Sequence, residues 1–95
     1  MKIKLKGTIQ TGQVWLNGES LPLGPSLKLR NHSPTGFSWG YLGSGPSQLA
    51  LAVMLVLHGP ERAQDCYMKF KEDIIAKLPQ KDFDIEIDLE RSYTW

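Results

Sequence analysis

This chain of 95 residues has little cysteine, almost no excess of positive over negative charge, and no long apolar run. Cys66 is the single cysteine, which excludes an internal disulfide and favours a reducing compartment. Eleven Lys and Arg residues stand against ten Asp and Glu, and the net charge of +1 predicts no strong general affinity for nucleic acid or anionic membranes. Residues 1–20 lack the apolar core of a signal peptide, and no run approaches the ~18 residues of a membrane span. We therefore expect a cytoplasmic protein without a membrane partner.

The apolar content is sufficient for one hydrophobic core. It amounts to 41% of the residues, which suits two packed layers in a chain of this length. We expect a single domain over residues 1–95 that folds without a metal or disulfide.

Strict alternation of apolar and charged residues predicts half-buried strands at residues 2–9 and 82–91. Their polar faces carry opposite charges, with lysine at 2, 4 and 6 and carboxylates at 84, 86, 88 and 90. Opposite charges across a strand pair stabilise a sheet, so we expect these strands to be neighbours. Their helix-facing sides then bring Ile3 and Leu5 beside Ile85 and Ile87. An exposed docking edge is the alternative role of either charged row.

Three shorter segments complete the predicted strands. Residues 14–16 and 19–21 flank Asn17-Gly18, a dipeptide that favours a two-residue hairpin loop. Residues 27–30 alternate again after a stretch interrupted by proline and glycine, and predict a further short strand.

The longest apolar run, residues 49–57, predicts a central buried helix that begins near Pro46. Its cap is Ser44 or Gly45, and Gly59-Pro60 ends it. A second helix follows directly and stops at Pro79. Its apolar stripe, in which we expect a buried and inert Cys66, consists of Ala63, Cys66, Tyr67, Phe70, Ile74 and Leu78. The order β-β-β-β-α-α-β predicts an α+β fold, with two helices on one face of a small antiparallel or mixed sheet.

Residues 31–46 contain four glycines and two prolines, a composition that excludes a helix. Phe37, Trp39 and Tyr41 recur here with a period of two. They form either a stacking platform for bases, or a patch for a partner protein, or a lid on the core.

The end of this segment, residues 43–48, leads into the central helix, whose first N–H groups can hold an anion. It lacks the Gly-Lys-Ser/Thr of a Walker loop and the third glycine of a dinucleotide fingerprint. Ordinary capping of the helix is the alternative to ligand binding.

Arg30-Asn31-His32-Ser33 mixes groups suited to phosphate binding or acid–base work, but no spacing identifies a nucleophile or metal ligand. We predict no catalytic residue, metal or cofactor. The predicted ligand-binding or partner-binding residues are Arg30, Asn31, His32, Trp39, Tyr41, Ser44, Gly45 and Gln48.

Residues 31–52, NHSPTGFSWGYLGSGPSQLALA, resemble the signature of a family of small uncharacterised bacterial proteins, a domain of unknown function often carried on plasmids, phages and other mobile elements. Residues 26–29 and 67–71 also resemble its pattern. The resemblance implies an accessory cytoplasmic protein and no particular reaction, cofactor or site.

Three functions compete. The first is a noncatalytic interaction module of a mobile element that uses residues 31–48 to contact a protein partner. The second is a small enzyme or binding protein for a phosphorylated or anionic ligand, held by Arg30, His32, Ser44 and Gly45. The third and least favoured is a weak nucleic-acid binder, which requires one basic face made of Lys2, Lys4, Lys6, Lys28 and Arg30.

Overall fold

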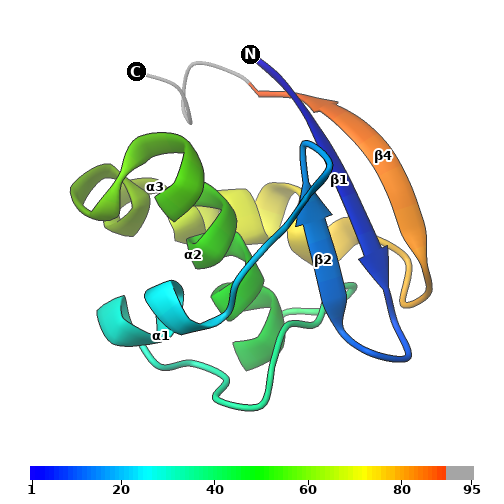
Figure 1. The fold of residues 1–95 in the computed structure, drawn as a ribbon, viewed down its shortest axis with the longest axis horizontal. Helices are drawn as coiled ribbons and strands as arrows, with labels where there is room; N and C mark the ends of the chain where they lie inside the picture. Colours follow the sequence, from blue (N-terminus) through cyan, green and yellow to red (C-terminus); the bar gives the residue numbers. More distant parts are fainter. Residues whose placement is uncertain (90–95) are drawn as a thin grey trace.

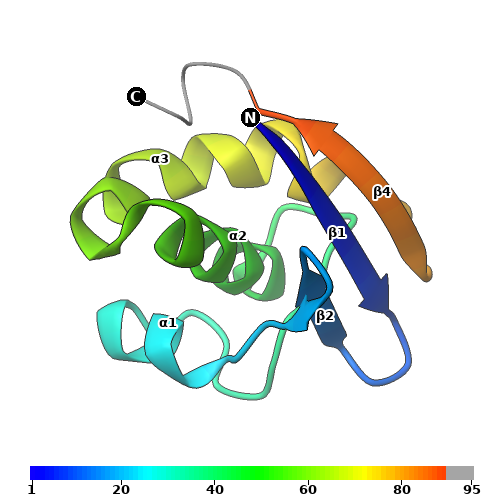
Figure 2. The same ribbon diagram turned by 45° about the horizontal axis from the view of Figure 1, so that its top comes forward.

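The computed structural model describes residues 1–89 and has an α+β fold, as predicted (Figure 1). Within these residues the strands are β1 (Lys2–Thr8), β2 (Gln13–Leu16), β3 (Glu19–Ser20) and β4 (Phe83–Asp88). They form an antiparallel sheet in the order β3-β2-β1-β4. The helices α1 (Gly24–Leu29), α2 (Ser44–His58) and α3 (Pro60–Asp73) pack on one face of the sheet and leave the other face bare (Figure 2).

The pairing of β1 with β4 is confirmed. Ile3 lies opposite Ile87 and Leu5 opposite Ile85, on the side that faces the helices. The charged rows lie directly across from each other on the outer side, as the pairs Lys2–Asp88, Lys4–Glu86 and Lys6–Asp84. Glu90 and Arg91, with which the predicted strand ended, lie outside the described residues.

The hairpin between β2 and β3 is also confirmed. Asn17 and Gly18 have φ values of 52° and 83°, the left-handed geometry that this dipeptide tolerates. The turn is also tied to β1, because Asn17 Oδ1 accepts the Lys4 N–H and the Asn17 N–H donates to the Lys4 carbonyl, both at 2.8 Å.

The predicted strand at residues 27–30 is wrong, because residues 27–29 belong to helix α1 and Arg30 is its C-cap. Pro25 lies in the first turn, where its fixed φ suits a helix and its missing N–H costs nothing. The buried Ser26 hydroxyl donates to the Leu23 carbonyl at 2.9 Å. Four alternating residues are too few to distinguish a strand from a single helical turn, and burial against α2 decides the conformation.

Helix α2 is the central helix, as predicted, with every residue from 45 to 54 buried. It begins at Ser44, and its cap is Gly43 instead of Ser44 or Gly45. At the other end Gly59 has a φ of 84° and donates its N–H to the Leu55 carbonyl, so the predicted glycine cap is confirmed. No helix in residues 1–89 is long and apolar enough to cross a membrane.

Helix α3 buries the predicted stripe only as far as Phe70. It ends at Asp73, short of the predicted stop at Pro79, and a 3-10 turn, η1 (Ile75–Lys77), follows. The backbone of Ile74 leaves helical geometry, so that Ile75 is fully buried in the core while Ile74 and Leu78 of the predicted stripe pack against it partly buried. Cys66 is buried as predicted, and this burial raises the pKa of its thiol.

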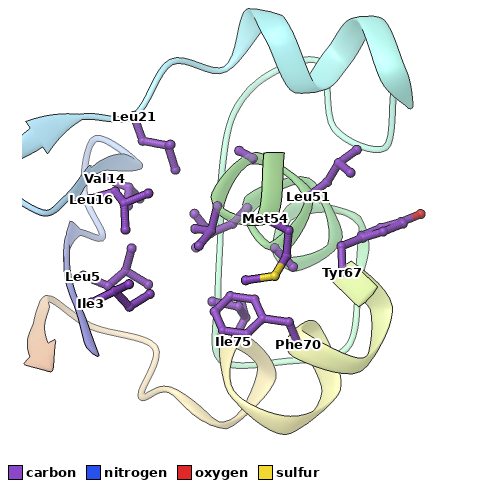
Figure 3. Close-up of a cluster of buried hydrophobic side chains, with 14 of the residues drawn as sticks. Ile3, Leu5, Val14, Leu16, Leu21, Leu51, Met54, Tyr67, Phe70 and Ile75 are labelled. Atoms are coloured by element: carbon purple, nitrogen blue, oxygen red, sulfur yellow. The ribbon is translucent and has the colours of Figure 1, made fainter. Parts of the chain in front are cut away.

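The core lies between the sheet and the two long helices. Side chains from β1, β2 and the loop after β3 meet those of α2, α3 and η1, and the Tyr67 hydroxyl points away from this apolar cluster (Figure 3). The largest fully buried side chain is that of Trp39, which comes from the irregular segment 31–43. That segment is therefore part of the folded interior.

Candidate functional site

Gln48 holds the irregular segment against the first turns of α2. Its side chain is fully buried, and its Oε1 accepts the backbone N–H groups of His32 at 2.7 Å and Ser33 at 3.0 Å. Its Nε2 donates to Ser26 Oγ at 2.9 Å. One amide thus joins α1, residues 32–33 and α2.

His32 is half-buried and forms a 2.9 Å hydrogen bond through Nε2 with the Tyr67 hydroxyl of α3. The two rings are tilted against each other with their centroids 5.7 Å apart. Desolvation, followed by the positive charges of Lys71 and Arg30, lowers the pKa of His32 below its ordinary value. The imidazole is therefore held in its neutral form near neutral pH.

Lys71 is a buried lysine on α3 that reaches the first turn of α2. Its Nζ donates to Ser47 Oγ at 3.0 Å, and Ser47 Oγ donates to the Gly43 carbonyl at 2.9 Å. Lys71 makes no ion pair with a residue in the described range 1–89. Because the Ser47 hydroxyl is buried and its proton is engaged with a carbonyl, it is not placed to act as a nucleophile.

Trp39 fixes the middle of the segment. Its ring is fully buried and packs edge-on against Phe83 with centroids 4.9 Å apart, while its Nε1 donates to the Lys81 carbonyl at 2.9 Å. Trp39 therefore closes the core, and of the three predicted aromatics only Tyr41 is exposed.

Close approach of the segment to α2 requires Gly45. A Cβ at this position would lie 2.6 Å from the Ser38 Cβ and 3.1 Å from the Ser38 nitrogen. Gly45 thus serves as a packing contact, because only a residue without a side chain lets the segment lie on the helix.

The exposed surface of the segment is concentrated at residues 41–42. Tyr41 is 44% exposed and Leu42 is 70% exposed, while Arg30, Asn31 and Ser44 are also at the surface. The Ser44 side chain makes no capping hydrogen bond. The predicted site residues therefore divide into a buried group and an exposed group, with His32 between them. The buried group is Trp39, Gly45 and Gln48, and the exposed group is Arg30, Asn31, Tyr41 and Ser44.

The basic residues do not form the single face that a general nucleic-acid binder requires. Lys2, Lys4 and Lys6 lie on the outer face of the sheet beside an acidic row, whereas Lys28 and Arg30 belong to the α1 region on the helical side. Residues 1–89 also contain no group of three or more His, Cys, Asp or Glu residues that could hold a metal ion.

Sequence reasoning missed the partners of the segment, namely Ser26, Ser47, Tyr67 and Lys71. Their contacts join positions far apart in the chain, which periodicity cannot reveal. The resemblance noted in the sequence offered one signal, because residues 26–29 and 67–71, which resemble the family pattern, contain three of these four side chains.

These features define a small α+β protein in which an irregular, glycine-rich segment is held between α1, α2 and α3 and exposes two large side chains. The chain belongs to a family of unknown function, DUF6166, whose model matches residues 5–93. No curated protein and no solved structure matches it.

Proposed function

We propose that the protein is a noncatalytic interaction module that contacts a protein partner through Tyr41 and Leu42. The observation that carries the proposal is the combination of a pinned backbone with exposed apolar side chains. Gln48 holds the segment at His32, and the buried ring of Trp39 holds it three residues before Leu42, yet Leu42 remains 70% exposed.

This geometry suits recognition because the loop is already ordered. Ordering a loop on binding lowers affinity, and a loop held in advance avoids that cost. Tyrosine in particular is enriched among the residues that dominate interface energies. The buried Ser47 hydroxyl, by contrast, is engaged with the Gly43 carbonyl and with Lys71 and is not paired with a base.

The wider role is that of an accessory cytoplasmic protein of a bacterial mobile element. The resemblance of residues 31–52 to such proteins supports this context. A partner in the bacterial host is then the expected target of the Tyr41–Leu42 surface.

The test compares matched variants as bait for host proteins. Tyr41→Ser with Leu42→Ser removes the proposed contact, while Val56→Ser with Met68→Ser removes exposed apolar side chains on α2 and α3. Quantitative mass spectrometry of cross-linked complexes should show a partner that the first double variant loses and the second retains. Equal recovery of every protein by both variants would contradict the proposal.

A small anion at the first turn of α2 is the second candidate function. It is favoured by Lys71, whose buried ammonium has a hydroxyl and no described carboxylate as its partner. A buried cation without a counter-charge is costly, so an anion beside it would be stabilised. Titration with phosphate and sulfate should shift the amide signals of Ser44, Gly45 and Ser47 in wild type and not in Lys71→Met. Unchanged amides at millimolar anion would exclude this function.

A further inference from the structure

The bare outer face of the sheet contains a hollow that the proposed function does not use. Its volume is about 330 Å³, and it is lined by Lys4, Lys6, Trp15, Gly18 and Asp84. None of these residues belongs to the segment 31–48, and the helices cover the opposite face of the sheet (Figure 2).

Strand register assembles this hollow from three strands. Lys6 lies directly opposite Trp15 of β2 on one side and opposite Asp84 of β4 on the other. A carboxylate, an ammonium and an indole therefore follow one another across the sheet. Lys4 lies two residues from Lys6 on β1, so both lysines project from the same face.

The turn beside the hollow is fixed in place. Two 2.8 Å hydrogen bonds join Asn17 to the backbone of Lys4, which fixes the neighbouring Gly18 at the wall of the hollow. A side chain at Gly18 would meet no atom within 4 Å, so this wall is open to solvent and accessible to a ligand.

The two lysines of the hollow differ from the third lysine on the same strand. Lys2 lies 3.9 Å from Glu86 in an ion pair, whereas Lys4 and Lys6 make no ion pair with a residue in the range 1–89. Lys6 instead places its Nζ 5.5 Å from the centroid of the Trp15 ring. The side chains that line the hollow are therefore two ammonium groups, one carboxylate and an aromatic ring, and Glu86, which pairs with Lys2, lies opposite Lys4 at the border of the hollow.

We propose that this hollow binds a nucleotide unit: the Lys6 ammonium moves from the Trp15 ring to the phosphate, which it holds together with Lys4, and the base packs on the indole in its place. Aromatic side chains bind bases by stacking, and lysines bind phosphate by charge. Asp84 accepts a hydrogen bond from a sugar hydroxyl or an exocyclic amino group. A neutral sugar would use the indole and the carboxylate but would leave both lysines without a partner.

Two sources supply this chemistry, a free nucleotide and a single-stranded nucleic acid. The Trp15 indole and Gly18 amide signals are followed in NMR titrations with AMP, adenosine, ribose 5-phosphate and a short single-stranded oligonucleotide. We expect AMP to bind more tightly than adenosine or ribose 5-phosphate, because each of these lacks one half of the contact. Saturation by AMP at millimolar concentration assigns the free nucleotide, and binding of the oligonucleotide alone assigns the nucleic acid.

Matched variants test the residues. Trp15→Leu should weaken binding roughly tenfold or more, and Lys4→Gln with Lys6→Gln should weaken it and reduce its dependence on salt. Lys2→Gln, on the same strand and face but outside the hollow, should bind like wild type. Far-UV circular dichroism establishes that each variant is folded. If Trp15→Leu does not fold, the affinity of the double variant Lys4→Gln with Lys6→Gln tests the proposal.

The proposal is overturned by any of three results. The first is the absence of shifts with both AMP and the oligonucleotide at millimolar concentration. The second is wild-type affinity in the double lysine variant. The third is an equal loss in Lys2→Gln, which would mean nonspecific attraction to a basic strand. None of these results bears on the Tyr41–Leu42 contact, since the variants leave that surface intact.

Discussion

Gln48 and His32 meet through a 2.7 Å hydrogen bond from the His32 backbone N–H to the Gln48 side-chain oxygen, in a part of the protein where Gln48 has no contact with solvent. Gln48, a residue of the central helix, thereby supplies a hydrogen-bond acceptor for a backbone N–H group of the irregular segment. Buried backbone donors need such partners, so the conformation of the segment depends on this amide.

Replacement of this amide should destabilise the protein. Gln48→Leu preserves most of the volume but leaves the N–H groups of His32 and Ser33 without their acceptor. A buried donor without a partner costs ~1–3 kcal/mol, so the urea midpoint should fall clearly. Gln64→Leu, at an exposed position of α3, is the control and should leave the midpoint nearly unchanged. Similar midpoints for the two variants would show that the segment is held by other contacts.

Addition of a methyl group at Gly45 should push the segment off α2. The new Cβ of Gly45→Ala would approach the Ser38 Cβ to 2.6 Å, and overpacking of this kind typically costs ~1–3 kcal/mol. Gly24→Ala, in α1 with no atom within 4 Å of the new Cβ, should be neutral or slightly stabilising. Thermal denaturation compares the two, and equal Tm values would mean that the segment moves aside without cost.

The central position of α2 predicts a large effect at Leu51. Leu51→Ala removes a fully buried side chain and should cost ~2–5 kcal/mol, a large part of the 5–15 kcal/mol of a typical domain. Val56→Ala on the same helix, where the side chain is 59% exposed, should change the free energy of unfolding by less than about 0.5 kcal/mol. An unchanged denaturation midpoint for Leu51→Ala would place this face of α2 at the surface.

His32 should make the stability of the protein depend on pH. Its pKa is lowered in the folded state, so the unfolded chain binds a proton more readily. The free energy of unfolding is unaffected by His32 titration above about pH 6.5, the ordinary pKa of histidine. It declines as the pH falls from there toward the lower pKa that His32 has in the folded protein. Wild type should therefore lose more stability than His32→Gln across this window. Parallel pH profiles for the two proteins would contradict the shift.

Lys71 should contribute to that shift through its charge. Lys71→Met keeps an apolar stem but removes the ammonium, so the pKa of His32 should rise toward its ordinary value. Lys69→Met, an exposed neighbour paired with Asp73, serves as the control. NMR titration of the His32 ring measures both, and an unchanged His32 pKa in Lys71→Met would exclude the coupling.

The periodicity of the sequence is sufficient to predict the outer strands and the central helix. Residues 2–8 and 83–88 alternate apolar with polar positions and carry opposite charges, so the amino-acid pattern alone predicts their pairing. Helix α1 is not predictable in this way, because its Gly24-Pro25 start resembles a chain break and its short alternation resembles a strand. A pattern of alternating residues therefore predicts a strand reliably only when it extends over six or more residues, as in β1 and β4.

The candidate site is less predictable for a different reason. Its residues stand out by composition, but which of them point inward depends on partners that are distant in sequence, such as Lys71 for Ser47 and Tyr67 for His32. The hollow at Trp15 has no signal in the sequence, because it forms only through the register of β1 with β2 and β4.

The pairing of β1 with β4 also sets the order in which the protein can form during synthesis. β1 leaves the ribosome before both long helices and β4 leaves it after them, so the sheet stays incomplete while the helices are made. During that interval Lys2, Lys4 and Lys6 place three like charges along a strand that has not met its acidic neighbour. Two nascent chains that tried to pair through this strand would bring lysine against lysine, which disfavours association. The charge pattern that specifies the finished sheet therefore also protects the unfinished one from aggregation.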